Sequence, residues 1–203
     1  MPVEIEAKFR VGDAEQVRRA IAAAGGQSQG VQLEVNTILD APDRRLRQAG
    51  CGLRVRLLKP WPPSRGSEAT GSDAGAGVLT FKGPRQPSGE DVKVRAEYET
   101  AVSDAGAALA VLGHLGFQPV IVYEKRRATW VVDACSVTLD ELPGLGWFAE
   151  IEGPTPAAVA AVRGRLGLAE VPVVRETYVE LAARHGRLRT DPRSGAEVRQ
   201  LVF

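Results

Sequence analysis

The sequence predicts an α+β fold in which eight antiparallel strands close into a β-barrel and helices pack outside it. Several short segments alternate apolar and charged residues with a period of two, which is typical of strands. The few helical segments do not alternate strictly with the strands, and this favours an antiparallel sheet over a parallel one. Eight strands are enough to close into a barrel. The 203 residues give room for one large domain with a sizeable core.

The individual elements follow from these patterns and from their end signals. Asp13 can cap a helix that ends at Gly25, and Thr155, followed by a proline, can cap another. Residues 60–77 are rich in Pro, Gly and Ser, and we expect a mobile hairpin loop there. The expected strands are 2–10, 29–40, 52–59, 78–83, 91–102, 120–132, 135–141 and 147–153, and the expected helices are 13–24, 105–115, 155–166 and 176–185.

The domain is expected to span residues 1–185. Residues 186–203 are basic and contain glycine, so we expect a flexible tail or one that docks late.

Composition and charge indicate which binding partners and which cellular compartment to expect. The net charge of +1 argues against a nucleic-acid binder, and no apolar run approaches the ~20 residues of a membrane span. Two cysteines, Cys51 and Cys135, are too few for a disulfide framework or a zinc site. We therefore expect a cytoplasmic protein, a monomer or homodimer, that binds neither nucleic acid nor a membrane.

The charged residues of the expected strands fall on one face of each strand. This face could lie in water, with ion pairs across neighbouring strands. Alternatively, helices could cover the apolar face from outside, and the charged face would then line the barrel. Charges inside a barrel need partners or a highly charged ligand, because desolvating them is costly. The face carries the cations Lys8, Arg54, Arg56, Lys82, Arg95, Lys125 and Arg127, and the anions Glu4, Glu6, Glu97, Glu99, Asp140, Glu150 and Glu152.

Seven short motifs follow one another between residues 2 and 182. They are Glu4-x-Glu6-x-Lys8, Asn36 to Asp40, Leu53 to Arg56, Leu79 to Pro84, Arg95 to Glu99, Glu124 to Arg127, and Leu139 to Gly146 with Phe148 to Gly153. In this order they resemble the CYTH superfamily, also called triphosphate tunnel metalloenzymes. The resemblance implies that the charged face lines a tunnel that binds a triphosphate.

The resemblance also implies roles for the charged residues. Carboxylates suit Mg²⁺ (or Mn²⁺), and Arg and Lys neutralise phosphates. The expected metal ligands are Glu4, Glu6, Glu150, Glu152 and Asp140; the expected phosphate-binding residues are Lys8, Arg54, Arg56, Lys82, Arg95, Lys125 and Arg127; the expected catalytic residues are Lys8, Lys82 and Asp140.

Alternative roles remain for four of the charged residues. Arg95 could instead pair with Glu97 or reach a nucleobase, and Glu152 could form a salt bridge with an arginine of the tunnel. Glu97 and Glu99 could be metal ligands, although partners that orient the arginines are favoured.

Among CYTH proteins, the motifs from residue 124 onward are most similar to class IV adenylyl cyclases, which convert ATP to cyclic AMP and pyrophosphate. The alternative activity is that of a triphosphatase, acting on inorganic tripolyphosphate or thiamine triphosphate. A polyphosphate or nucleotide binder without catalysis is a third possibility. Ile38 and Leu39 stand where relatives usually have aromatic residues, and Ile38 cannot activate water together with Lys82 as a tyrosine there can.

Overall fold

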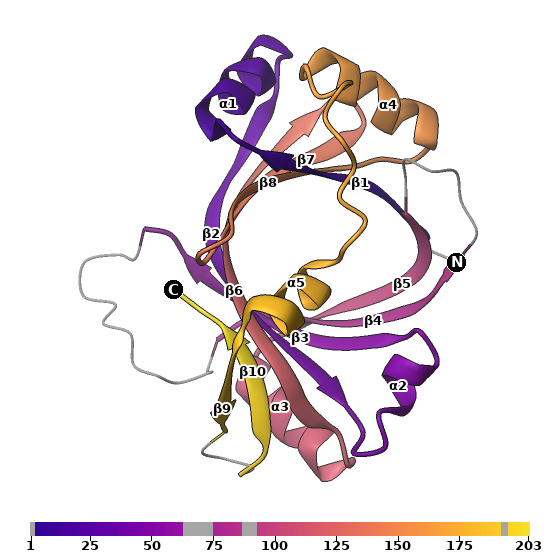
Figure 1. Ribbon diagram of the computed structural model, residues 1–203, viewed down its shortest axis with the longest axis vertical. Coiled ribbons are helices and arrows are strands. Elements are labelled where there is room, and N and C mark those ends of the chain that lie inside the picture. Colours follow the sequence, from indigo (N-terminus) through magenta and orange to yellow (C-terminus); the bar gives the residue numbers. More distant parts are fainter. Residues whose placement is uncertain (1–2, 63–74, 87–92, 192–194) are drawn as a thin grey trace.

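The computed structural model describes residues 3–62, 75–86, 93–191 and 195–203, which form ten strands and five helices (Figure 1). The strands are β1 (Val3–Val11), β2 (Gln27–Asp40), β3 (Gly52–Pro60), β4 (Gly77–Gln86), β5 (Lys93–Val102), β6 (Gln118–Val132), β7 (Cys135–Leu142), β8 (Gly146–Glu152), β9 (Arg187–Thr190) and β10 (Glu197–Leu201). The helices are α1 (Ala14–Ala23), α2 (Arg45–Gln48), α3 (Ala105–His114), α4 (Pro156–Arg165) and α5 (Tyr178–His185).

Eight of the strands form a closed ring. Their order is β2-β3-β4-β5-β1-β8-β7-β6, and pairing of β2 with β6 closes it. Every pairing within the ring is antiparallel. This confirms the predicted eight-stranded antiparallel barrel with helices outside.

Two of the predicted helix caps are present. The Asp13 side chain accepts hydrogen bonds from the backbone N–H groups of Glu15 and Gln16, at 2.9 and 3.0 Å. Thr155 accepts from the N–H of Ala158 at 3.1 Å and caps α4. The sequence analysis missed α2, which is only four residues long and begins after Arg44 in a left-handed conformation. A tertiary contact holds this helix, because the buried Asp40 accepts from its N–H groups.

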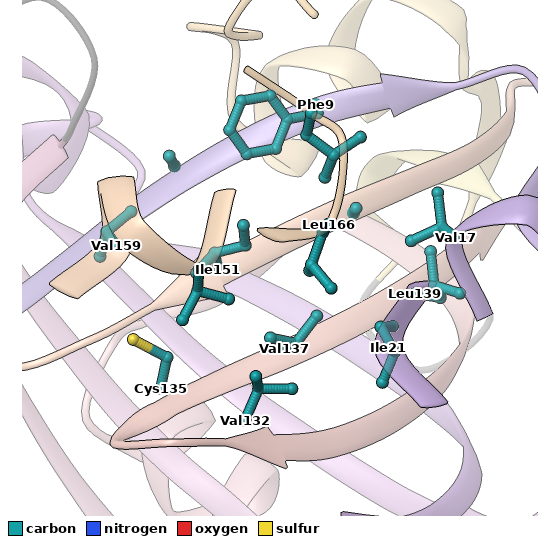
Figure 2. Packing of buried hydrophobic residues seen from close by; sticks show 14 of the residues in the cluster. Phe9, Val17, Ile21, Val132, Cys135, Val137, Leu139, Ile151, Val159 and Leu166 are labelled. Carbon is teal, nitrogen blue, oxygen red and sulfur yellow. The ribbon is translucent and has the colours of Figure 1, made fainter. Parts of the chain in front are cut away.

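The largest apolar cluster lies outside the ring, between the strands and helices α1 and α4 (Figures 1 and 2). Phe9, Val137 and Ile151 contribute from the strands, and Ile21 and Val159 from the two helices; all are at most 2% exposed. The helices thus cover the apolar face of this part of the ring. The opposite face of the same strands, which carries the charges, points inward.

The C-terminal residues differ from the expectation of a flexible tail. β9 and β10 form a hairpin, and β10 pairs in parallel with residues 121–123 of β6. That stretch of β6 is available because β7 pairs only with residues 126–132. Leu201 packs in a cluster with Tyr178 and Leu181 of α5. The segment is polar in composition. It is ordered because β10 pairs with an edge of β6 and because Leu201 packs into the apolar cluster of α5. Neither contact can be predicted from the local sequence pattern.

A substitution tests this docking of the C-terminus. We expect Leu201→Ala to lower the free energy of unfolding by about 2 kcal/mol, because it removes a buried side chain from the α5 cluster. Leu188→Ala on β9, where the leucine is 51% exposed, should change it by less than about 0.5 kcal/mol. Chemical denaturation measures both. Equal values for the two variants would support a flexible tail instead.

Two further expectations concern the loop and the membrane. Most of the loop predicted at 60–77 falls on residues 63–74, which lie outside the described part of the chain, so its mobility stays a prediction. In the described part, the helices are too short or too polar for any of them to span a bilayer.

Candidate active site

Charged side chains from strands that are not neighbours meet inside the ring. Lys82 of β4 contacts Glu4 of β1 at 2.6 Å, although β5 lies between these strands. Arg127 of β6 likewise contacts Glu150 of β8 at 2.5 Å across β7. Such pairs form only on the concave side of a closed sheet. The predicted charged face therefore lines the interior rather than lying on an outer, solvated surface.

Asp140 of β7 is the centre of the most buried group, with no exposed surface. Its carboxylate accepts two hydrogen bonds from Arg127, at 2.7 and 2.6 Å, and one from Lys125 at 3.3 Å. Burial alone would lower the pKa of Arg127, but the charges of Asp140 and Glu34 outweigh it and raise that pKa well above its usual value. Arg127 is therefore charged, and its two hydrogen bonds to Asp140 fix the orientation of both side chains.

Tyr178 brings α5 into the same group. Its hydroxyl donates to Asp140 at 2.7 Å, and its ring lies 3.9 Å from the Nζ of Lys8. Burial and then the charge of Asp140 raise the pKa of Tyr178 well above its usual value, so the phenol stays protonated and can donate. Lys8 is 1% exposed and lies 3.6 Å from Glu150. Tyr178 lies in the helix expected at 176–185, and no pattern in the sequence indicated its contact with Asp140.

Three aromatic side chains pack together inside the ring, next to α5. Tyr178 lies against Tyr123 of β6 and edge-on to Phe148 of β8, with ring centroids 6.4 and 5.7 Å away. All three are at most 6% exposed. The helix that supplies Tyr178 begins with a capping box of Thr177 and Glu180. In Figure 1, α5 lies at the lower edge of the opening of the ring.

Glu34 of β2 is an interior residue that the sequence analysis missed. It is fully buried, 3.2 Å from Lys125, 3.3 Å from Arg56 and 3.8 Å from Arg127. The period-two pattern could have found it, because Glu34 shares its strand face with Asn36 of the motif at residues 36–40. These cations hold the pKa of Glu34 far below its usual range, despite its burial.

A second group of charges lies around Lys82 and Arg54. Lys82 donates to Glu4 at 2.6 Å and to Glu97 at 3.0 Å. Arg54 contacts Glu99 at 3.3 Å and Glu97 at 3.9 Å. Glu97 and Glu99 are thus partners of the cations, which is the interpretation that the sequence favoured.

Arg95 differs from the other inward cations because its guanidinium donates to a backbone carbonyl. Its guanidinium donates to the backbone carbonyl of Gly83, at 3.0 and 2.6 Å. Gly83 lies where the pairing of β4 with β5 shifts register, between Lys82 and Arg85. Arg95 therefore holds this irregularity, while the charges of Glu4 and Glu97 are near enough to act on its guanidinium.

The inward carboxylates are suitable ligands for a divalent metal, but in the described residues they are not arranged as a complete coordination site. Among the described residues, no group of three or more Asp, Glu, His or Cys side chains is arranged to hold an ion. Glu6 and Glu152 are register partners, and burial followed by the charges of Glu4 and Glu6 raises the pKa of Glu152. Mg²⁺ commonly takes one or two carboxylates and completes its shell with water and phosphate oxygens. Glu4, Glu6 and Glu152 repel one another, and a cation between them would relieve this repulsion, although Glu4 also accepts from Lys82. Asp140 and Glu150 both accept from Arg127.

Comparison with known proteins decides the family. The CYTH domain model matches residues 2–178. The chain belongs to the CYTH family. Adenylate cyclase CyaB of Aeromonas hydrophila is 30% identical over 152 residues, which are 73% of this chain and 67% of that one.

Solved CYTH-like structures share the fold. PH1819 of Pyrococcus horikoshii is 25% identical, with a TM-score of 0.70 over 89% of this chain and 98% of its own. HpAC1 of Hippeastrum, described as revealing a dominant triphosphatase activity, is 19% identical with a TM-score of 0.65, over 89% and 96% of the two chains. Adenylate cyclase and triphosphatase thus both appear among the proteins that this CYTH chain resembles.

Proposed function

We propose that this CYTH protein binds a triphosphate inside the ring and cleaves one of its phosphorus–oxygen bonds with the help of Mg²⁺ or Mn²⁺. The observation that carries the proposal is the set of cations that converge inside a closed sheet, with side chains at most 21% exposed. A phosphate chain can accept hydrogen bonds from several of them at once. The proposed phosphate-binding residues are Lys8, Arg54, Arg56, Lys82, Lys125 and Arg127.

Charge balance supports the metal. Among the described inward side chains, carboxylates are at least as numerous as cations once Glu34 is included, and a triphosphate would add several negative charges. A divalent cation at Glu4, Glu6 and Glu152 would offset them, and when bound would supply positive charge to the phosphoryl oxygens. Lys8 and Lys82 would neutralise charge that develops on the leaving phosphate. Asp140 would act by orienting Arg127 and Lys125.

The first proposed reaction is that of an adenylate cyclase, because the relative CyaB carries that name at 30% identity. The ribose 3′-hydroxyl of ATP attacks the α-phosphorus and loses its proton, and the bond from the α-phosphorus to the bridging oxygen breaks. The products are cyclic AMP and pyrophosphate. Lys and Arg side chains of the interior would hold the departing pyrophosphate.

A second proposed reaction is hydrolysis of a triphosphate. The packing of Tyr123, Phe148 and Tyr178 favours it, because these buried side chains contact one another beside Asp140 and present no exposed aromatic face on which a nucleobase could stack. A simple phosphate chain needs no such face. In this reaction water attacks the terminal phosphorus and loses a proton, and the bond from that phosphorus to the bridging oxygen breaks. The products are orthophosphate and the corresponding diphosphate.

Product analysis distinguishes the two reactions. The purified protein is incubated with Mg²⁺ or Mn²⁺ and, separately, with ATP, tripolyphosphate and thiamine triphosphate. Cyclic AMP with pyrophosphate would support the cyclase, and orthophosphate without cyclic AMP the triphosphatase. We expect EDTA to abolish either activity. Binding of these compounds with no turnover even when metal is present would contradict both and indicate a binding protein.

A further inference from the structure

Glu34 carries a negative charge at the place where three proposed phosphate-binding cations converge. Its side chain is fully buried and lies between Arg56, Lys125 and Arg127, at 3.2 to 3.8 Å. Glu4, Glu97 and Glu99 are 10, 15 and 45% exposed, so they are in contact with solvent. Glu34 has no exposed surface, so its charge stays beside these cations whether or not a ligand is bound.

The geometry indicates that Glu34 acts through its charge and not through directed hydrogen bonds. Neither of its carboxylate oxygens accepts a well-directed hydrogen bond from the described residues. The cations direct their N–H groups elsewhere: Arg56 Nε donates to Asn36 at 3.0 Å, and Arg127 and Lys125 donate to Asp140 at 2.7 and 3.3 Å. Asn36 and Asp140 therefore orient the cations, and removing the charge of Glu34 alone should leave them in place.

We propose that Glu34 is a fixed counter-charge that weakens the hold of Arg56, Lys125 and Arg127 on phosphate, so that a polyphosphate product can leave. The inference rests on the proposed function, since it concerns the same cations. A tunnel that pairs many cations with a polyanion risks binding its product too tightly. A permanent carboxylate beside the cations lowers the local positive potential without competing for their directed hydrogen bonds.

Calorimetric titration with inorganic tripolyphosphate and pyrophosphate, in EDTA so that no metal-dependent turnover occurs, tests this role. We expect Glu34→Gln, which keeps the shape and removes the charge, to bind pyrophosphate about tenfold more tightly than the wild type. In steady-state turnover with metal, kcat and KM should both fall and inhibition by added pyrophosphate should strengthen. A residue needed only for the fold would instead weaken binding when replaced.

Two variants serve as controls. Glu34→Asp keeps the charge and should stay within about twofold of the wild-type affinity. Glu141→Gln makes the same change of charge on the outer side of β7, where Glu141 pairs with Arg126, and should leave affinity unaltered.

Three outcomes would overturn the proposal. One is unchanged or weaker pyrophosphate binding by a folded Glu34→Gln variant while the wild type binds, and this leaves the proposed function intact. Another is loss of the fold in both Glu34→Gln and Glu34→Met, which would make Glu34 a structural residue. The third is failure of the wild type to bind either polyanion in EDTA; if the wild type also binds neither polyanion with Mg²⁺ present, the proposed function is overturned as well.

Discussion

Replacing Asp140 with alanine is expected to lower the free energy of unfolding by about 3–5 kcal/mol and to abolish turnover. The carboxylate has no exposed surface and accepts from Arg127, Lys125 and Tyr178. Without it, two buried cations lose a counter-ion and a buried phenol loses its acceptor, and water cannot easily replace these partners. Urea denaturation gives the change in stability, and product formation under the conditions above gives the change in activity.

The residue next in sequence provides the control for Asp140. Glu141 points to the opposite side of β7 and pairs with Arg126 at 3.0 Å in a partly exposed position. Glu141→Ala should therefore cost about 0–1 kcal/mol. If Asp140→Ala were no less stable than Glu141→Ala, then Arg127 and Lys125 would have to reach water or new partners, and Asp140 would not be the centre of the interior group.

The second large effect is expected for Glu4→Gln. This substitution keeps the volume of the side chain and one acceptor for Lys82, which now donates to Glu4 at 2.6 Å. The fold should survive, whereas kcat/KM with metal should fall about 100-fold or more, because a proposed metal ligand loses its charge. Because the loss acts through metal affinity, raising the Mg²⁺ concentration should restore part of the activity.

Measurements of metal dependence decide the result for Glu4. The midpoint of the Mg²⁺ titration should move to higher concentration in Glu4→Gln and stay unchanged in Glu15→Gln, which alters an exposed residue of α1. Wild-type activity with an unchanged midpoint would remove Glu4 from the metal site. A large loss of thermal stability would show that its ion pair with Lys82 serves the fold.

Much of the barrel could be predicted because strand patterning is a local property. The alternation of Glu4, Glu6 and Lys8 with apolar residues shows that they share one strand face, and the caps at Asp13 and Thr155 mark where helices begin. The same reasoning applied to residues 29–40 would have added Glu34 to the charged face. Glu34 lies two residues before the motif that begins at Asn36, so only its place on the strand face identifies it.

The remaining features depend on contacts between segments far apart in the chain. No local pattern shows that Tyr178 meets Asp140, that Arg95 donates to Gly83, or that β10 pairs with β6. These contacts form because closure of the ring determines which strands lie opposite one another. They also form because α5 and β10 pack against strands of the closed ring. The sequence pattern by itself therefore determined which side chains share the inward face of each strand. Only the closed sheet determined which of these side chains form ion pairs, because ion pairs and strand pairing require proximity in space.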